Sequence, residues 1–399
     1  MIKVYADNNA TTPLHPEVLE AMMPYLKEHF GNASSLHVWG RMAREAVDNA
    51  RLKTAQIISA DPSEIYFTSC GTESDNWAVK GIIDAHKSQS IHIITSHVEH
   101  HAVLNVYKYL EKKGCEVTYL PVDSKGVVSL FELKKSIRDN TILVSVMYAN
   151  NETGILEPVK EISAYIKELN DERVTLGKTK IYFHSDAVQA LGKVKIDVKE
   201  LNIDLMSFSA HKINGPKGIG ALYIKKGTKI NPMLHGGHHE NHKRAGTENT
   251  AGIVGFGKAC SIAENNFKEH TEKLQKLREM LLQGITKNIK EVYINGDINN
   301  SIPNTLNVSF NYIEGESVVI NLDLAGIGVS SGSACTSGSM ASSYVLKAMR
   351  VSPVLAQGSI RFSMGIFNTE KDIKYIIDAL PPIIKKLREM SPLYKKKER

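Results

Sequence analysis

The chain has 399 residues, of which 42% are hydrophobic and 23% are charged, and its formal net charge is +6. This composition is ordinary for a folded protein and excludes a disordered chain, while the length favours two domains. The positive excess is modest and the basic residues are scattered except at the very end, so the sequence does not indicate a nucleic-acid partner.

Cysteine usage and the first residues bear on the compartment. Cys70, Cys115, Cys260 and Cys335 form no C-x-x-C pair, so neither a zinc knuckle nor a disulfide scaffold is indicated. The opening segment MIKVYADNNATTP lacks an apolar signal core, and no uninterrupted apolar run is long enough to cross a bilayer. We therefore expect a cytoplasmic protein without a membrane partner.

Short apolar runs alternate with amphipathic stretches through the first two thirds of the chain. The predicted strands lie in residues 64–69, 91–96, 141–149, 180–187, 204–210 and 220–226. This alternation predicts βαβ units and an α/β fold with a mainly parallel sheet. Ligands of such sheets bind beyond the carboxyl ends of the strands, which is where the candidate residues below fall.

The later part of the chain predicts a smaller α+β domain. A long helix is expected over roughly 250–289, and a last helix over 370–388. Between these helices, strands are predicted in residues 305–312, 327–332 and 359–365. We expect a large domain at 14–258 and a small domain formed by 1–13 and 259–399. Residues 170–180, NDERVTLGKTK, are typical of a surface insertion.

The segment VSSGSACTSGS, residues 329–339, places Cys335 among small and polar residues. It offers little apolar surface to bury, whereas a cysteine retained for packing usually has apolar neighbours. A reactive cysteine needs solvent access and a thiolate form. Local composition leaves both interpretations open, because Gly-Ser segments are also ordinary loops.

Residues at the predicted strand ends suggest a cofactor site. Lys212, in SFSAHKINGPKGIG, can form a Schiff base if it is desolvated, although an arbitrary lysine in a turn is usually a surface residue. Asp186 closes a buried-looking strand and needs a cationic partner, which a protonated pyridine nitrogen would supply. Gly71 and Thr72 begin a helix whose backbone N–H groups can hold a phosphate.

Ser209 and His211 can add phosphate contacts beside that lysine. Each element alone is a common structural feature. Together they supply the amine, the carboxylate and the phosphate cradle that pyridoxal 5′-phosphate needs.

The order of several motifs extends this prediction to a family. The chain resembles the cysteine desulfurases of the NifS/IscS type, which are fold-type I, class V aminotransferase-like enzymes that use pyridoxal phosphate. The resemblance is carried by YADNNATTP, GNASSLH, TSCGTESDN, VEHHAV, ANNETG, HSDAVQALGK, SFSAHKINGPKGIGALY, RAGTENT, SSGSACTSGS and IRFSMG. It implies a large cofactor-binding domain and a small domain that carries the catalytic cysteine loop at about 328–342.

The resemblance also implies roles for single residues around the cofactor ring. Lys212 is the Schiff-base lysine, Asp186 faces the pyridine nitrogen, and Gln189 bonds the phenolic oxygen. His100 matches the histidine that stacks on the ring and is a proposed proton shuttle. Asn151 belongs to the cofactor site and, with Arg361, holds the substrate's carboxylate. A guanidinium suits that task independently, because it binds a carboxylate bidentately.

The phosphate site implied by the resemblance consists of Gly71, Thr72, Ser209 and His211. Thr247 matches a threonine that reaches the phosphate of the neighbouring subunit, which implies a homodimer.

The implied reaction converts L-cysteine to L-alanine, and the Cys335 thiolate takes the sulfur as a persulfide. A NifU/IscU-like scaffold protein for iron–sulfur cluster assembly is the implied acceptor. No resident metal is expected, apart from a transient contact of Cys335 with an iron–sulfur cluster.

Other interpretations stay open at this point. The same scaffold also suits a selenocysteine lyase, another β-lyase or an aminotransferase, none of which gives Cys335 a task. The histidine-rich segment HGGHHENH, residues 235–242, raises a metal site, but its spacing is not that of a helical ligand pair. Cys70 lies next to the predicted phosphate cradle, and its neighbours favour a packing role.

Overall fold

The computed structural model describes residues 3–86, 90–331 and 343–397, and the loop with Cys335 lies outside this part. The larger sheet has the strand order β2-β8-β7-β6-β5-β3-β4. Strand β8 runs antiparallel to its neighbours β2 and β7, and the remaining neighbours pair in parallel. Its strands are β2 (Ile65–Thr68), β3 (His92–Ser96), β4 (Glu116–Leu120), β5 (Thr141–Ser145), β6 (Tyr182–Asp186), β7 (Leu205–Ser209) and β8 (Gly220–Ile224). The predicted strands and the mainly parallel sheet are confirmed.

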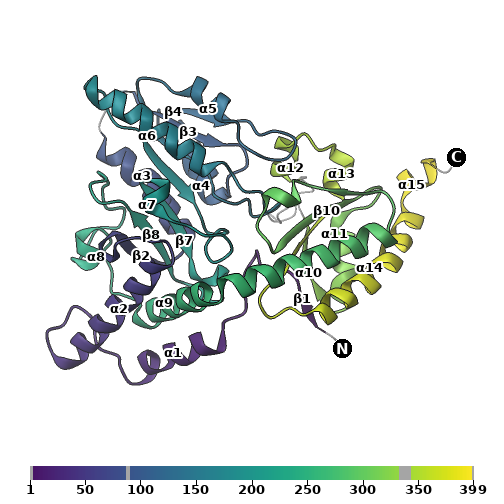
Figure 1. The fold of residues 1–399 in the computed structure, drawn as a ribbon, viewed down its shortest axis with the longest axis horizontal. Coiled ribbons are helices and arrows are strands. Elements are labelled where there is room, and N and C mark those ends of the chain that lie inside the picture. Colours follow the sequence, from purple (N-terminus) through teal and green to yellow (C-terminus); the bar gives the residue numbers. More distant parts are fainter. Residues whose placement is uncertain (1–2, 87–89, 332–342, 398–399) are drawn as a thin grey trace.

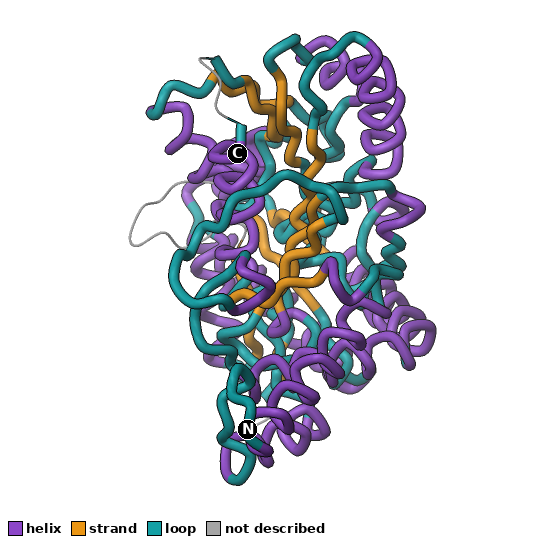
Figure 2. Tube along the Cα trace, turned by 90° about the vertical axis from the view of Figure 1, so that its left-hand side faces the viewer, coloured by secondary structure: helices purple, strands orange, loops and turns teal. Residues whose placement is uncertain are grey.

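Successive residues of the central strands pack on opposite faces of this sheet, as strand geometry requires. In β6, Tyr182 belongs to the apolar cluster around Trp77 of helix α3, whereas Phe183 joins the cluster that contains Val47 and Phe256 of helices α2 and α9. Helices therefore cover both faces (Figure 2). The helices and short 3₁₀ turns of this part are α1 (Pro16–Lys27), α2 (Val38–Gln56), η1 (Pro62–Glu64), α3 (Gly71–Ala85), α4 (His101–Lys112), α5 (Leu130–Ser136), α6 (Val159–Thr175), α7 (Val198–Leu201), η2 (Ala210–Lys212), α8 (His239–His242) and α9 (Thr250–Asn265).

The smaller sheet is antiparallel, with the strand order β12-β13-β10-β9. It lies beside the larger sheet in the opposite half of the molecule (Figure 1). Helices α10, α11 and α14 bury their apolar faces with β10 and β13 in one cluster. The elements are β9 (Val292–Ile294), β10 (Thr305–Phe310), β11 (Ile327–Gly328), β12 (Ser330–Ser331), β13 (Ser359–Ser363), α10 (Phe267–Asn288), η3 (Ile298–Asn300), α11 (Gly315–Leu324), α12 (Tyr344–Ala348), α13 (Pro353–Gln357), α14 (Glu370–Met390) and α15 (Pro392–Lys397). The exact division into domains stays a prediction.

The beginning of the chain joins the larger and smaller sheets. β1 (Val4–Tyr5) pairs in parallel with β11, and Asn8 N donates to Ser363 O at 3.0 Å. A few residues later, Thr12 N donates to His211 O at 3.0 Å, just beyond the end of β7. This N-terminal segment, residues 4–13, therefore connects β13 to the turn that carries Lys212.

The structure corrects the single long helix expected over 250–289. The helix is interrupted at Asn266, whose φ of −107° and ψ of 16° end α9 and begin α10. The Nδ2 of this asparagine donates to Ile262 O at 2.9 Å, a local bond that competes with helix continuation. The interruption lets α9 pack on α1 and α2 while α10 packs on α14.

Most residues of 170–180 are exposed, as expected of a surface segment, but the structure corrects the expectation of an insertion. Residues 170–175 form the last turns of α6, and Asn170 and Arg173 are buried. Asn170 exchanges hydrogen bonds with the backbone of Ile181 at 2.8 Å, and Arg173 donates to the backbone oxygens of Thr179 and Asp139 at 2.8 Å. The polar side chains of Asn170 and Arg173 therefore form hydrogen bonds with backbone groups, although their residue types are those expected at a surface.

None of the described helices combines the length and the apolar character needed to cross a lipid bilayer.

Candidate active site

A cavity of about 410 Å³ opens where the carboxyl ends of β6 and β7 meet the N-terminus of α3. Because β2, β3 and β5 run parallel to these strands, the residues that follow them reach the same edge. The cavity brings together the predicted residues Gly71, Thr72, His100, Asn151, Asp186, Gln189, Ser209, His211, Lys212 and Arg361. It is also lined by Asn9, Ala10, Cys70, Asp75, Met147, Ala149 and Val188.

Lys212 extends into this cavity from η2, directly after β7. Its Nζ donates to the backbone oxygens of Asn9 at 2.6 Å and Ala10 at 2.7 Å. Burial, together with the positive charge of Arg361, lowers the pKa of this amine to about 8. A larger fraction of the amine is therefore neutral and nucleophilic near neutral pH than for an exposed lysine.

Asp186 ends β6 and is almost fully buried. Its Oδ1 accepts a hydrogen bond from Val188 N at 2.9 Å, and burial raises the pKa of the carboxyl to about 6 despite the opposing charge of Lys212. Asp75, from α3, borders the same cavity, and burial followed by repulsion from Asp186 raises its pKa further. Burial and this repulsion therefore favour the protonated form of Asp75, and Asp186 is the carboxylate placed to pair with a cation.

The N-terminus of α3 lies where the phosphate cradle was predicted. The side chain of Cys70, the N-cap residue, makes no capping hydrogen bond within the described residues, which leaves the first helical N–H groups available. A Cβ at Gly71 would lie 2.8 Å from Val188 Cγ2 and 3.5 Å from Ser209 Cβ, so a glycine keeps this approach open. Ser209 Oγ, at the end of β7, is buried and has no hydrogen-bond partner among the described residues. These features suit a phosphate group.

Two histidines border the cavity as neutral rings. Burial and the charge of Lys212 lower the pKa of His100 and of His211 to about 4. Nδ1 of His100 accepts a hydrogen bond from Ala102 N at 3.2 Å, which caps α4 and places the ring proton on Nε2. His211 bonds the hydroxyl of Thr11 at 3.1 Å through its own Nδ1.

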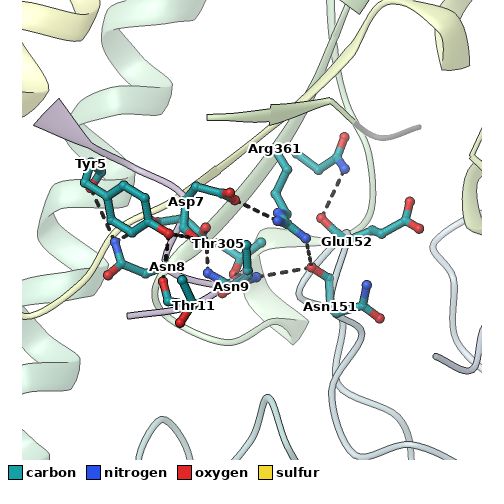
Figure 3. A network of polar contacts seen from close by, with 12 residues as sticks. Tyr5, Asp7, Asn8, Asn9, Thr11, Asn151, Glu152, Thr305 and Arg361 are labelled. Atoms are coloured by element: carbon teal, nitrogen blue, oxygen red, sulfur yellow. Dashed lines mark hydrogen bonds and ion pairs between the residues drawn. The ribbon is translucent and has the colours of Figure 1, made fainter. Parts of the chain in front are cut away.

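Arg361, from β13, is held by the N-terminal segment and by the turn after β5 (Figure 3). Its Nη2 pairs with Asp7 Oδ1 at 2.7 Å, and its Nη1 donates to the backbone oxygen of Asn151 at 2.9 Å. In the described structure, Arg361 Nε and Asn151 Oδ1 are buried and have no hydrogen-bond partner. A small carboxylate entering the cavity would meet an orientated cation here.

Some predicted residues lie outside the cavity. Thr247 is exposed in the segment between α8 and α9 and does not line it. Cys335 is outside the described residues, so its predicted role is carried by the sequence alone. Cys70 was expected to pack, yet it is only half-buried and lines the cavity.

The histidine-rich segment 235–242 has a structural function. Its buried residue Glu240 binds Arg51 through two contacts of 2.6 and 2.8 Å and accepts a hydrogen bond from Phe67 N at 2.8 Å. Across the described residues, no group of three or more His, Cys, Asp or Glu side chains is arranged to hold a metal ion.

Sequence reasoning missed Asn9, Asp7, Asp75 and Lys193 as parts of the site. Asn9 O accepts from both Lys212 Nζ and Gln189 Nε2, the latter at 2.9 Å. All four residues lie within motifs that carried the resemblance. However, the sequence of a motif does not show which of its backbone and side-chain atoms contact residues that are distant in the chain.

The comparisons agree with this geometry. The model of the aminotransferase class-V family matches residues 4–376. The chain belongs to this family. It is 52% identical over 390 residues to a protein named cysteine desulfurase IscS from Dictyoglomus turgidum, which covers 98% of this chain and 96% of that protein.

Solved structures give the same result. A NifS-like protein superposes with a TM-score of 0.90 at 41% identity, covering 97% of this chain and all of the other. A structure described as SspA in complex with cysteine has a TM-score of 0.79 at 33% identity, covering 92% of this chain and all of the other. The predicted family and fold type are confirmed. Enzymes of this family depend on pyridoxal 5′-phosphate, which confirms the cofactor prediction.

Proposed function

We propose that the chain is a cysteine desulfurase that converts L-cysteine to L-alanine and passes the sulfur on as a persulfide of Cys335. The observation that carries the proposal is one cavity that combines the Lys212 amine, the buried Asp186 carboxylate and, beside the N-terminus of α3, the Ser209 hydroxyl, which has no partner among the described residues. The name of the Dictyoglomus relative and the cysteine in the SspA complex support the substrate.

Each of these groups has a task toward the cofactor and the substrate. Lys212 would hold the cofactor through its amine, Asp186 would keep the ring nitrogen protonated, and the start of α3 with Ser209 would bind the phosphate. When bound, the cofactor would withdraw electrons from the substrate's carbon skeleton, which would let the carbon keep the electron pair of the carbon–sulfur bond when a thiolate takes the sulfur. Arg361 binds the substrate's carboxylate beside Asn151.

The protein's own groups move the protons and the sulfur. The Lys212 amine, with its pKa near 8, can take a proton from a bound amino acid and return it. The Cys335 thiolate attacks the substrate sulfur, the carbon–sulfur bond breaks, and its electron pair stays on the carbon, which is protonated to give alanine. The sulfur remains on Cys335 as a persulfide until an acceptor thiol removes it.

Product analysis tests the proposal. Purified protein supplied with cofactor, L-cysteine and dithiothreitol should release alanine and sulfide in equal amounts, and Cys335→Ala should abolish both. Cys115→Ala, a half-buried cysteine outside the cavity, is the matched control. A fully active Cys335→Ala protein would refute this mechanism. Amino transfer to a 2-oxo acid that survives the loss of Cys335 would establish an aminotransferase, and a strong preference for selenocysteine would establish a selenocysteine lyase.

A homodimer is part of the proposal. The loop between α1 and α2 exposes apolar side chains, with Leu36 91% and Phe30 78% exposed, and Trp39 in the first turn of α2 is also exposed. Thr247 is exposed beyond the cavity, as expected of a residue that serves the partner's phosphate. Light scattering after gel filtration should give twice the chain mass, and Leu36→Glu should give a monomer with reduced cofactor affinity.

The acceptor and the compartment complete the proposal. The acceptor in this proposal is a scaffold protein for iron–sulfur clusters, as the resemblance of the motifs to the NifS/IscS-type enzymes implies, and persulfide transfer from radiolabelled L-cysteine to a co-purifying protein tests it. We place the enzyme in the cytoplasm, where reducing conditions preserve free thiols, consistent with Cys70, Cys115 and Cys260 being unpaired. Fractionation of cells tests the compartment.

A further inference from the structure

Lys193 is a buried lysine to which the proposed reaction gives no task. It follows the turn after β6, four residues beyond Gln189, and is 8% exposed. Burial, with the charges of Lys212 and Arg361, lowers its pKa to about 7. Within the described residues its Nζ forms no ion pair, and an amine buried without a carboxylate is costly.

The hydrogen bond of Lys193 explains its position. Its Nζ donates to Gln189 Oε1 at 2.7 Å, and on the other side of the amide Gln189 Nε2 donates to Asn9 O at 2.9 Å. Residues 188–193 form turns and not a helix, with Gly192 at a φ of 70°, and this path of the backbone brings the two side chains into hydrogen-bonding contact. Gln189 itself is 4% exposed and lines the active-site cavity.

In its protonated form, which the contact with Gln189 Oε1 favours, the Lys193 amine contains donors and no acceptor, so it distinguishes the two ends of an amide that are nearly equal in shape. If the amide of Gln189 turned over, its NH₂ would face the Lys193 ammonium and its oxygen would face the oxygen of Asn9. Both contacts would then be repulsive. Lys193 thus determines that the NH₂ end of the Gln189 amide lies beside Asn9. One of its two N–H groups donates to Asn9 O, which leaves the other to donate to a group in the cavity.

We propose that Lys193 is a positioning residue whose ammonium orients the amide of Gln189, so that an N–H and not a carbonyl oxygen serves the cavity. This inference rests on the proposed function, in which Gln189 contacts the phenolic oxygen of the cofactor. An N–H donor stabilises the anionic form of that oxygen, whereas a carbonyl would repel it. Asn9 O also accepts a hydrogen bond from Lys212 Nζ, so the Gln189 amide and the Lys212 amine share one acceptor.

The test is a pH titration of the visible absorption band of the protein with bound cofactor. Lys193→Met retains the length of the side chain and removes the donor, and we expect it to raise the midpoint by about one pH unit. Lys195→Met, the same change at an exposed position two residues further on, should leave the midpoint unchanged. Lys193→Arg retains a group that only donates and should stay close to the parent protein.

A second background separates orientation from simple charge. In a Gln189→Leu protein, Lys193→Met should cause no further shift, because the amide through which it acts is gone. An equal shift in both backgrounds, no shift in either, or a Lys193→Arg protein that shifts as far as the Met variant would overturn the inference. Thermal unfolding of each cofactor-free variant verifies that it is folded. A parent protein without any cofactor band would instead refute the proposed function itself.

Discussion

A substitution of Arg361 tests how the cavity selects an amino acid, because its guanidinium contacts the N-terminal segment and lines the cavity where the substrate's carboxylate is proposed to bind. It contacts Asp7 and the backbone of Asn151, and its Nε has no partner among the described residues. Arg361→Lys retains a positive charge beside Asp7 but replaces a planar fork by a point donor. The substitution therefore removes bidentate binding without leaving Asp7 unpaired.

The size of the effect follows from the hydrogen bonds that are lost. A hydrogen bond to a charged group contributes about 1.5–3 kcal/mol, and about 1.4 kcal/mol corresponds to a tenfold change in binding. Loss of one such bond to the substrate's carboxylate should raise KM for L-cysteine roughly 10- to 100-fold. The carboxylate does not react, so kcat should change much less.

The assay is alanine formation as a function of L-cysteine concentration, at fixed reductant and saturating cofactor. Arg138→Lys is the matched control, because Arg138 lies near the start of β5 at the opposite edge of the sheet and pairs with Glu116. A KM within twofold of the parent value, with cofactor binding intact, would show that Arg361 does not hold the carboxylate.

Three further outcomes are expected. Lys212→Ala should yield a colourless protein that forms no alanine, and borohydride followed by mass spectrometry should find the cofactor on Lys212 of the parent alone; an adduct on another lysine contradicts the assignment. Ser209→Ala should weaken cofactor binding about tenfold in a fluorescence titration, yet leave the melting temperature of the cofactor-free protein equal or higher, because the buried hydroxyl has no partner in the described structure. Burial raises the pKa of Glu99 to about 8, so the folded protein binds this proton more tightly than the unfolded chain and loses stability as the pH rises from about 4.5 to 8. Glu99→Gln should reduce that loss in urea unfolding of the cofactor-free protein, and an unchanged pH profile would count against a raised pKa.

The sequence predicted those parts of the structure that depend on the local residue pattern or on the order of elements along the chain. Strands such as Gly220–Ile224 are continuous apolar runs because helices cover both faces of the sheet. Lys212, Asp186 and Gly71 follow strands that run in the same direction, so their convergence was predictable from chain order alone. The roles predicted for single residues came from the family motifs, because a hydrophobic periodicity indicates secondary structure and not chemistry.

The errors have a different cause. Arg173 and Asn170 are polar and were assigned to the surface, but their partners are backbone groups that only the folded chain brings close. Asn266 interrupts a helix that the apolar pattern continued through, because packing on separate helix partners overrides local propensity. The contact of Lys193 with Gln189 depends on rotamers, which a motif does not specify.

The way residues 4–13 are held has a consequence for biosynthesis. Tyr5 and Asn8 are synthesised long before their partners Gly328 and Ser363. The larger sheet can form earlier, but Arg361 and the carbonyl groups around Lys212 can be put in place only after β13 has been synthesised. A nascent chain should therefore acquire its ability to retain the cofactor only after β13 has emerged from the ribosome.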